Sequence, residues 1–568
     1  MTHNKYNKEI TGAEAVILAL LDEGVKDVFG YPGGAIMPVY DALYDYSEQL
    51  THYLVRHEQG ATHAAQGYSR VSGKPGVVFA TSGPGATNLI TGIADAQIDS
   101  TPMVCITGQV HSHLLGTDAF QETDVVGISM PVTKWNIQVT TADEIAPAIA
   151  KAFFIATSGR PGPVLVDITK DAQFGKTIYN HKKCESIRSY FPHPKVNNES
   201  IEQAAALINS AKKPYILCGH GVLLSNAQQQ LIDFAQKGNI PVASTLLGLS
   251  AFPAQHPLYV GYLGMHGNYG PNLLTNECDV LIAIGMRFDD RVTGNVSKYA
   301  KQAKVIHFEI DPSEINKIIH ADIPVMGDAK ESLEMLLPLI ESKDRKEWLT
   351  RFAECNEIEM NKVINDAIHP TSEKLRMAEV IDKLYTLSEG KSIIATDVGQ
   401  HQMITTRYYK FNETNTNVTS GGLGTMGFGL PAAIGAKVAR PEKQVIAVLG
   451  DGGFQMTIQE LGTIMQSNIA VKILVLNNNF LGMVRQWQQL FFDRRYSFTE
   501  MKNPDFIAIA KGYNINGKKV TDRKNLSEAI QEMLDSKEAY ILEAVVENEE
   551  NVFPMITTGA SVSEIILE

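Results

Sequence analysis

The chain has 568 residues, of which 44% are hydrophobic and 20% are charged, a composition ordinary for a globular protein. Its 50 basic and 63 acidic side chains give a net charge of −13, which argues against a general nucleic-acid-binding surface. At this length we expect about three or four domains, because single hydrophobic cores stop growing at smaller sizes.

The cysteines and the start of the chain indicate the cellular compartment in which the protein resides. The cysteines are five in number and form no C-x-x-C pair, which favours a reducing compartment without a disulfide framework. No apolar stretch reaches the roughly 18 residues needed to cross a membrane. The first residues show neither a signal-peptide core nor the character of a transit peptide. We therefore expect a cytoplasmic protein without a membrane partner.

Short aliphatic runs alternate with helical patterns along the whole chain. Runs with the composition of buried strands occur at 76–80 and 163–168, at 215–219, 280–285 and 305–309, and at 445–449 and 470–476. This alternation is typical of α/β proteins and predicts three doubly wound parallel-sheet domains.

Two interruptions of the pattern divide the chain. Residues 176–199 contain two prolines and no clear period, and a charged helical stretch at 341–370 ends on Pro370. Ser200–Gln203 has the pattern of a capping box and predicts the start of a helix. We therefore expect domains at 1–175, 200–340 and 371–568, joined by linkers at 176–199 and 341–370.

Two strands of the last domain end on residues suited to a metal ion. Strand 445–449 runs into Gly450-Asp451-Gly452-Gly453, and strand 470–476 runs into Asn477-Asn478. Right-handed crossovers place both strand ends at the same edge of a parallel sheet, so a carboxylate and an amide oxygen meet there. Oxygen donors suit a hard divalent cation, and backbone N–H groups remain to hold a diphosphate. A lone Asp-Gly turn would be weak support; the coincidence of both strand ends is informative.

This pair of strand ends resembles the GDG…NN signature of thiamine diphosphate enzymes. The resemblance implies that Asp451, the Asn478 side chain and the backbone carbonyl of Phe480 bind Mg²⁺. It also places the activating acid of this superfamily at Glu58, within Arg56–Gly60 after a strand-like segment. Thiamine chemistry needs one acid that hydrogen-bonds to the aminopyrimidine ring. The ordinary alternative for a glutamate at a strand end is a surface charge.

A glycine-rich run, Ser420–Gly429, allows backbone to approach a ring closely. In the superfamily a bulky apolar residue props the cofactor into a bent shape, and Met426 occupies that place. A core methionine is the alternative, and both roles are compatible.

Four further segments point to one family within this superfamily. The resemblance covers nearly the whole chain. Phe29–Ile36, Thr117–Glu122, Ser158–Asp167 and Arg287–Gly294 look like the catalytic large subunit of acetohydroxyacid synthase (acetolactate synthase), of the biosynthetic FAD-containing type. Arg287–Gly294 is the most informative, because fermentative acetolactate synthases lack it. The implied reaction decarboxylates pyruvate on thiamine diphosphate and joins the hydroxyethyl group to pyruvate or 2-ketobutyrate. It is the first common step of valine, leucine and isoleucine biosynthesis.

The resemblance implies three cofactors: thiamine diphosphate, Mg²⁺ and FAD. The first domain would bind the pyrimidine, the central domain FAD, and the last domain the diphosphate and metal. No G-x-G-x-x-G fingerprint is present, so FAD depends chiefly on the resemblance. The implied FAD residues are Arg160, Thr245, Gly264, Met265, His266, Gly285, Arg287, Asp289, Arg291, Glu309 and Asp328. The implied thiamine diphosphate residues are Gly34, Glu58, Val398, Gly399, Gln400, His401, Gly424, Met426, Gly450, Asp451, Gly452, Gly453, Asn478, Gly482 and Met483.

The same resemblance assigns residues near the substrate. Trp487 would shape the pocket for the second substrate and favour 2-ketobutyrate; a helix-face core position is the alternative. Arg291 would pair with a substrate carboxylate or the flavin. Gln121 and Lys170 join the catalytic neighbourhood by resemblance alone.

Glu58 and the diphosphate motif come from opposite ends of the chain, and in related enzymes from different subunits. We therefore expect a homodimer or homotetramer, together with a small regulatory subunit. Two other functions stay open: a pyruvate oxidase-type enzyme and a non-catalytic flavin-binding regulatory protein. Arg287–Gly294 and Trp487 argue against the first, and the intact Glu58, Asp451 and Asn478 argue against the second.

Overall fold

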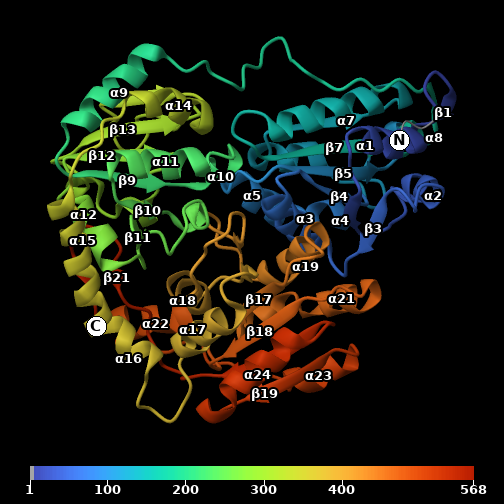
Figure 1. The fold of residues 1–568 in the computed structure, drawn as a ribbon. Helices are drawn as coiled ribbons and strands as arrows, with labels where there is room; N and C mark the ends of the chain where they lie inside the picture. Colours follow the sequence, from blue (N-terminus) through green and yellow to red (C-terminus); the bar gives the residue numbers. More distant parts are fainter. Residues whose placement is uncertain (1–4) are drawn as a thin grey trace.

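Three six-stranded sheets form the framework of the computed structural model, which describes residues 5–568 (Figure 1). Within each sheet every pair of neighbouring strands is parallel. Helices cover both faces of each sheet, because successive strand residues point to opposite sides and are apolar on both. The predicted fold class, three doubly wound parallel-sheet domains, is confirmed.

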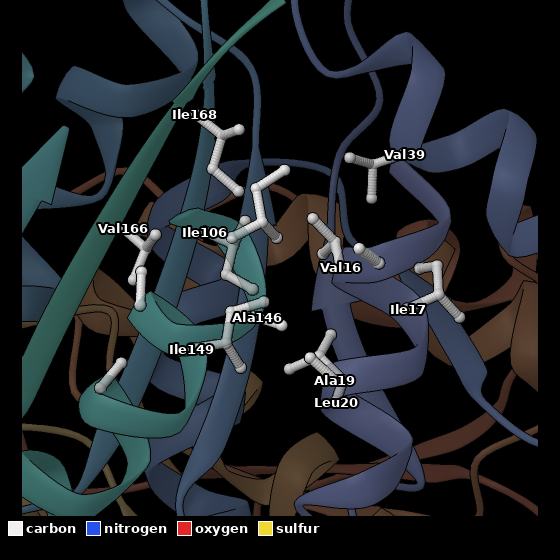
Figure 2. Close-up of a cluster of buried hydrophobic side chains, with 14 of the residues drawn as sticks. Val16, Ile17, Ala19, Leu20, Val39, Ile106, Ala146, Ile149, Val166 and Ile168 are labelled. Atoms are coloured by element: carbon white, nitrogen blue, oxygen red, sulfur yellow. The ribbon is translucent and has the colours of Figure 1, made fainter. Parts of the chain in front are cut away.

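The N-terminal sheet has the strand order β3-β2-β4-β5-β7-β6. Its strands are β2 (Asp27–Gly30), β3 (Thr51–Leu54), β4 (Gly76–Ala80), β5 (Met103–Gln109), β6 (Trp135–Val139) and β7 (Pro163–Thr169). Helices α1 (Gly12–Asp22), α2 (Met37–Tyr44) and α7 (Ala142–Thr157) cover one face, and α3 (Glu58–Ser72) and α5 (Ile90–Ile98) cover the other. Figure 2 shows Ile106 of β5 and Val166 of β7 facing Val16 of α1 and Ile149 of α7.

The central sheet has the order β11-β10-β9-β12-β13-β14. Its strands are β9 (Pro214–Cys218), β10 (Val242–Ser244), β11 (Tyr259–Tyr262), β12 (Val280–Ile284), β13 (Lys304–Glu309) and β14 (Ile323–Met326). Helices α9 (Asn198–Ser210), α11 (Gln228–Gly238) and α14 (Ala329–Leu336) pack on one face, and α12 (Tyr269–Thr275) and α15 (Lys346–Glu359) on the other. This is the strand order of dinucleotide-binding folds, with its reversal point between β9 and β12.

The C-terminal sheet has the order β16-β15-β17-β18-β20-β19, the same connectivity as the N-terminal sheet. Its strands are β15 (Ile393–Thr396), β16 (Asn417–Thr419), β17 (Val445–Gly450), β18 (Lys472–Asn477), β19 (Asn516–Val520) and β20 (Tyr540–Val545). One face carries α17 (Met377–Ser388), α18 (Gln400–Tyr408) and α24 (Arg523–Asp535); the other carries α19 (Gly429–Ala439), α21 (Leu461–Ser467) and α23 (Phe506–Gly512).

One local prediction is wrong, and the first linker holds more structure than the sequence suggested, whereas the second linker is helical as expected. The capping box expected at Ser200 does not form: α9 begins at Asn198, and Asn197 caps it by accepting from the Glu199 N–H. Within 176–199, β8 (Lys176–Ile178) pairs antiparallel with β1 (Glu9–Thr11). Within 341–370, α15 continues through a π-helical turn at Met360–Ile364. The domain limits given above stay a prediction.

The N- and C-terminal domains of one chain meet where α3 crosses α19. The crossing is too close for side chains at two glycines. A Cβ on Gly67 would lie 1.9 Å from the Ala432 carbonyl oxygen, and one on Gly435 would lie 1.7 Å from that of Ala64. Glycine at both positions therefore lets the two backbones touch.

Among residues 5–568, no helix is long and apolar enough to span a bilayer.

A buried ion pair joins the second linker to the C-terminal domain, and its two partners also bind backbone of the central domain. Arg407 of α18 pairs with Glu359 at the end of α15, and their side chains are 1% and 2% exposed. Glu359 also accepts from the Tyr269 N–H at 2.7 Å, and Arg407 donates to the backbone carbonyls of His266 and Gly267. The pair thereby fixes the 264–268 loop of the central domain against α18.

Replacing Glu359 with alanine should lower the free energy of unfolding by about 3–5 kcal/mol, because the Arg407 charge would stay buried without a partner. Urea denaturation measures the loss. Lys298→Ala is the control, since Lys298 pairs with Glu564 at the surface, where the side chains are 54% and 52% exposed, and it should leave the transition midpoint in place. Equal midpoints for Glu359→Ala and the native chain would contradict the assignment.

Candidate active site

A cavity of about 850 Å³ lies where the three domains meet. Its walls come from the carboxyl ends of strands in the central and C-terminal sheets and from the loops beside α5 and β7. In parallel sheets these strand ends are where ligands bind, next to the point at which the strand order reverses.

The predicted site residues fall into two sets, those that line this cavity and those that do not. One set lines it and includes every predicted residue of the central and C-terminal domains, together with Arg160. Its members are Arg160, Thr245, Gly264, Met265, His266, Gly285, Arg287, Asp289, Arg291, Glu309, Asp328, Val398, Gly399, Gln400, His401, Gly424, Met426, Gly450, Asp451, Gly452, Gly453, Asn478, Phe480, Gly482, Met483 and Trp487. The other set does not line it and consists of Gly34, Glu58, Gln121 and Lys170.

Asp451 and Asn478 lie side by side because β17 pairs with β18. The register places Gly450 opposite Leu476, so the residues that follow these strands share one sheet edge. The segment between them differs from the single crossover helix usual in such units. It forms α20 (Asp451–Met456), a 3₁₀ turn at Ile458–Glu460 and α21, because Thr457 leaves the helical conformation.

The donors at this edge fit Mg²⁺. Within the described part of the chain no three His, Cys, Asp or Glu side chains gather as a metal cluster. A cation here would therefore use one carboxylate with amide and backbone oxygens, which is a donor set that Mg²⁺ accepts. Asp451 is 1% exposed, and burial raises the pKa of its carboxyl to about 6. A nearby cation would offset that cost of burial.

Two residues of this corner escaped the sequence analysis. The Asn503 amide donates to Asp451 Oδ2 at 2.6 Å and to Asn477 Oδ1 at 2.9 Å, and so orients the carboxylate. Asp397, which is fully buried, accepts from the N–H groups of Val398, Gly427 and Gly429. The strand-end rule could have found Asp397, which directly follows β15. No sequence signal points to Asn503.

Met426 lies half-buried at the cavity wall rather than in the core. Gly424 and Gly427 on either side adopt positive φ angles of 67° and 89°, a conformation that favours glycine. A Cβ on Gly452 would come within 3.7 Å of the Met426 terminal methyl, so the methionine reaches over the Gly450–Gly453 turn.

The central-domain side of the cavity suits a dinucleotide. The loops after β9 and β12 touch each other: a Cβ on Gly219 would lie 2.3 Å from the Gly285 carbonyl oxygen. These loops follow the strands at the reversal point, where such folds bind dinucleotides, and Gly285 lines the cavity there. Arg160 reaches across from the N-terminal domain and donates to Glu314 at 2.9 Å. Burial raises the pKa of Glu309, at the end of β13, to about 7.

Trp487 and Arg291 face the same cavity. Trp487 belongs to α22 (Gly482–Phe491) and is half-buried beside Phe491, with ring centroids 4.9 Å apart. The tryptophan is therefore not a core residue of this chain. The Arg291 side chain is 60% exposed, and its ion pair with Asp290 is long, at 3.7 Å.

The set outside the cavity gathers at the carboxyl edge of the N-terminal sheet. Glu58 begins α3 after β3, is 8% exposed, and accepts from the Asn88 amide at 2.9 Å. A Cβ on Gly85 would lie 3.2 Å from its other carboxylate oxygen. Gln121 contacts Gly83 in the same loop after β4, and Lys170 follows β7. Gly34 precedes Ala35, whose N–H donates to Thr81 at 3.2 Å.

Comparison with known proteins agrees with this geometry. Residues 10–128, 201–336 and 397–544 match the N-terminal TPP binding, central and C-terminal TPP binding domains of thiamine pyrophosphate enzymes. The acetolactate synthase large subunit of Buchnera aphidicola subsp. Schizaphis graminum is 45% identical, over 98% of both chains. The isozyme 2 large subunit of Escherichia coli K12 is 45% identical, over 98% of this chain and 99% of its own. The chain belongs to the acetolactate synthase large subunit family.

Membership of this family establishes the activity and the cofactors. The chain carries thiamine diphosphate-dependent acetolactate synthase activity, a step of branched-chain amino acid biosynthesis, with Mg²⁺ and FAD as its further cofactors. A probable acetolactate synthase large subunit of Methanocaldococcus jannaschii is also 45% identical, over 98% of this chain. These relatives favour the synthase over the pyruvate oxidase-type and non-catalytic alternatives.

Asp451→Ala should abolish Mg²⁺-dependent binding of thiamine diphosphate, because the only carboxylate among the predicted metal ligands would be lost. Asn503→Ala should weaken binding by about tenfold, since it removes one hydrogen bond to that carboxylate. Calorimetric titration of the cofactor, with and without Mg²⁺, measures both. Asp505→Asn is the control: Asp505 caps α23 through two backbone N–H groups and should leave affinity unchanged. Native affinity in Asp451→Ala would contradict the metal assignment.

Proposed function

We propose that the chain forms its active site between two copies of itself. One copy supplies the cavity with Asp451, Asn478 and Met426, and the other supplies Glu58 with its neighbours. The separation of the predicted residues into a set that lines the cavity and a set that does not carries this proposal. A C2 dimer brings both pairs of half-sites together at once, since each copy donates what the other lacks. A homotetramer would contain two such dimers.

In the cavity half, Asp451, the Asn478 side chain and the Phe480 carbonyl would hold Mg²⁺, which neutralises the diphosphate. The backbone N–H groups of Gly452 and Gly453 are free of side-chain bulk and would bind the phosphate oxygens. Asn503 keeps the Asp451 carboxylate turned toward the metal through its 2.6 Å hydrogen bond. Val398, Gly399, Gln400 and His401 would line the rest of the thiamine site, with Gly482 and Met483 opposite.

In the other half, Glu58 would hydrogen-bond to the aminopyrimidine ring. Asn88 engages one of its carboxylate oxygens, and within residues 5–568 the other oxygen makes no hydrogen bond. A buried carboxyl with one fixed and one available oxygen can hold a proton at a defined position. When bound, thiamine diphosphate supplies the carbon nucleophile and the electron sink that decarboxylation of a 2-keto acid requires.

The second substrate would lie between Trp487 and Arg291. Arg291 is exposed to the cavity and offers a bidentate donor for the carboxylate of pyruvate or 2-ketobutyrate. These two acceptors differ by one methylene, and an aromatic wall such as Trp487 discriminates such a difference by about 1–3 kcal/mol. Gln121 and Lys170 would approach from the other copy.

FAD would have a structural role, since the ligation involves no net oxidation or reduction. Arg160, Arg287 and the backbone at Gly285 would bind its phosphates and ribose on the central domain.

A small regulatory subunit is a further proposed partner, because the relatives are named large subunits. We also propose a cytoplasmic location, since all five cysteines are free thiols, as a reducing compartment requires.

Two inactive variants should restore activity when mixed. Glu58→Gln and Asp451→Ala each lose most turnover alone, because each damages one half-site. After subunit exchange at equal amounts, heterodimers hold one intact site, so acetolactate formation should recover to about a quarter of the native rate. Mixtures that stay inactive, although heterodimers are detected by native mass spectrometry, would show that each chain builds its own site.

Trp487→Leu should lower the preference for 2-ketobutyrate over pyruvate by about tenfold, since a flexible side chain replaces the aromatic wall. Competition between the two acceptors, with the product ratio measured by chromatography, tests this. Phe491→Leu is the matched control, because Phe491 packs on Trp487 yet does not line the cavity. A product ratio equal to that of the native chain would remove Trp487 from the pocket.

A further inference from the structure

Two carboxylates of the N-terminal domain hold the loop that leads to Met426. Asp95 lies in the last turns of α5, and Asp99 is the C-cap residue of the same helix. Their side chains are 0% and 1% exposed. They pack against the segment Ser420–Thr425 of the C-terminal domain, which we call the Ser420 turn. In Figure 1, α5 lies near the centre of the molecule, beside α3 and α10 (His220–Leu224).

Asp99 forms an ordinary buried ion pair with Arg70. It accepts from Arg70 of α3 at 2.8 Å, from the Gly421 N–H at 2.8 Å and from the Gly422 N–H at 2.7 Å. His220 of the central domain contacts the Asp99 carbonyl oxygen through Nδ1 at 3.0 Å. All three domains therefore meet at this residue, and the Arg70 guanidinium compensates its charge.

Asp95 forms no direct ion pair within the described residues. Its Oδ1 accepts from the Ser420 hydroxyl and, at 2.8 Å, from the Thr425 hydroxyl. The Ser420 oxygen in turn accepts from the Thr425 N–H at 2.9 Å, which closes the turn around the carboxylate. Its Oδ2 is buried without a hydrogen bond within the described residues. A buried carboxylate oxygen that lacks a partner costs stability and calls for an explanation.

Met426 is consequently held on both sides. On one side Asp95 binds Thr425, and on the other Asp397 accepts from the Gly427 N–H at 3.0 Å. The second anchor belongs to the same domain as Met426, whereas the first belongs to the N-terminal domain. The orientation of Met426 in the cavity therefore depends on how the two domains dock.

We propose that Asp95 is a positioning residue, which as a carboxylate fixes the Ser420 turn so that Met426 projects into the cavity to support the bound cofactor. The inference rests on the proposed role of Met426. It gives the N-terminal domain a second role, because this domain would shape the cofactor site of its own chain in addition to donating Glu58 to the other copy.

The charge of Asp95 opposes folding at neutral pH. Burial, and then the neighbouring Asp99, raise the pKa of Asp95 from 3.8 to about 6, against the opposing effect of Arg70. These are the charged groups that face it; Ser420 and Thr425 are neutral donors. Because the folded pKa is raised, protonation of Asp95 stabilises the fold below pH 3.8, and this contribution is lost as the pH rises through about 6.

Asp95→Asn separates these effects. The variant should be as stable as the native chain or more stable at pH 8, yet bind thiamine diphosphate and Mg²⁺ about tenfold more weakly in calorimetry, because neutral acceptors hold hydroxyl donors less tightly. If Asp95 must be ionised, its protonation should lower kcat/KM as the pH falls through about 6, and this part of the loss should be absent in the variant. Ser420→Ala removes the donor from the opposite side. It should weaken binding similarly, and the double variant should add little, as expected for one shared interaction.

Asp167→Asn is the matched control. Asp167 is a fully buried carboxylate of the same domain whose oxygens accept from Thr107, Gln109 and Gln138, and burial raises its pKa too. It touches neither the cavity nor the Ser420 turn, so cofactor affinity should not change. Native affinity in Asp95→Asn, or an equal loss in Asp167→Asn, would overturn the inference. Met426→Ala distinguishes the two proposals: native affinity there would instead refute the role of Met426.

Discussion

Parallel pairing of neighbouring strands is the constraint on which the site depends. Because β15, β17 and β18 run in the same direction, the residues after each strand share one sheet edge. Asp397, Asp451 and Asn478 are brought together by this register alone, although they are far apart in the sequence. The central sheet repeats the arrangement at Gly219, Gly285 and Glu309. One backbone geometry therefore provides both the proposed metal site and the proposed dinucleotide site, and the two lie in one cavity.

This constraint also explains what the sequence could predict. A buried strand can be recognised from its apolar run, and the residue after it is then known to lie at the ligand edge. Asp451 and Asn478 were placed at this edge in this way, and the register of β17 and β18 agrees with that placement. The resemblance added residues such as Gly285, Met426 and Trp487, which line the cavity and whose roles stay predictions. The capping box at Ser200 failed because Asn197 offered a competing cap only three positions earlier in the chain.

What the sequence could not predict depends on contacts between segments that lie far apart in the chain. Asn503 reaches Asp451 from a loop, and Glu359 meets Arg407 from a linker helix. Asp95 contacts Ser420 across 325 positions of sequence. None of these residues belongs to a periodic pattern, and each could equally be a surface polar group. Only the folded structure reveals which of them are buried, and therefore which must find partners.

The glycine contact between α3 and α19 has a mechanical consequence. Since backbone touches backbone at Gly67 and Gly435, the two helices have no intervening side chains that could change rotamer and absorb a displacement. Helix α3, which also packs on the N-terminal sheet, is thus closely coupled to the C-terminal domain, and Glu58 is its first residue. In the proposed dimer, that residue serves the neighbouring site. A shift of the C-terminal domain in one copy would then move Glu58 of that same copy, which serves the cofactor bound by its partner, so that the two active sites would be mechanically linked.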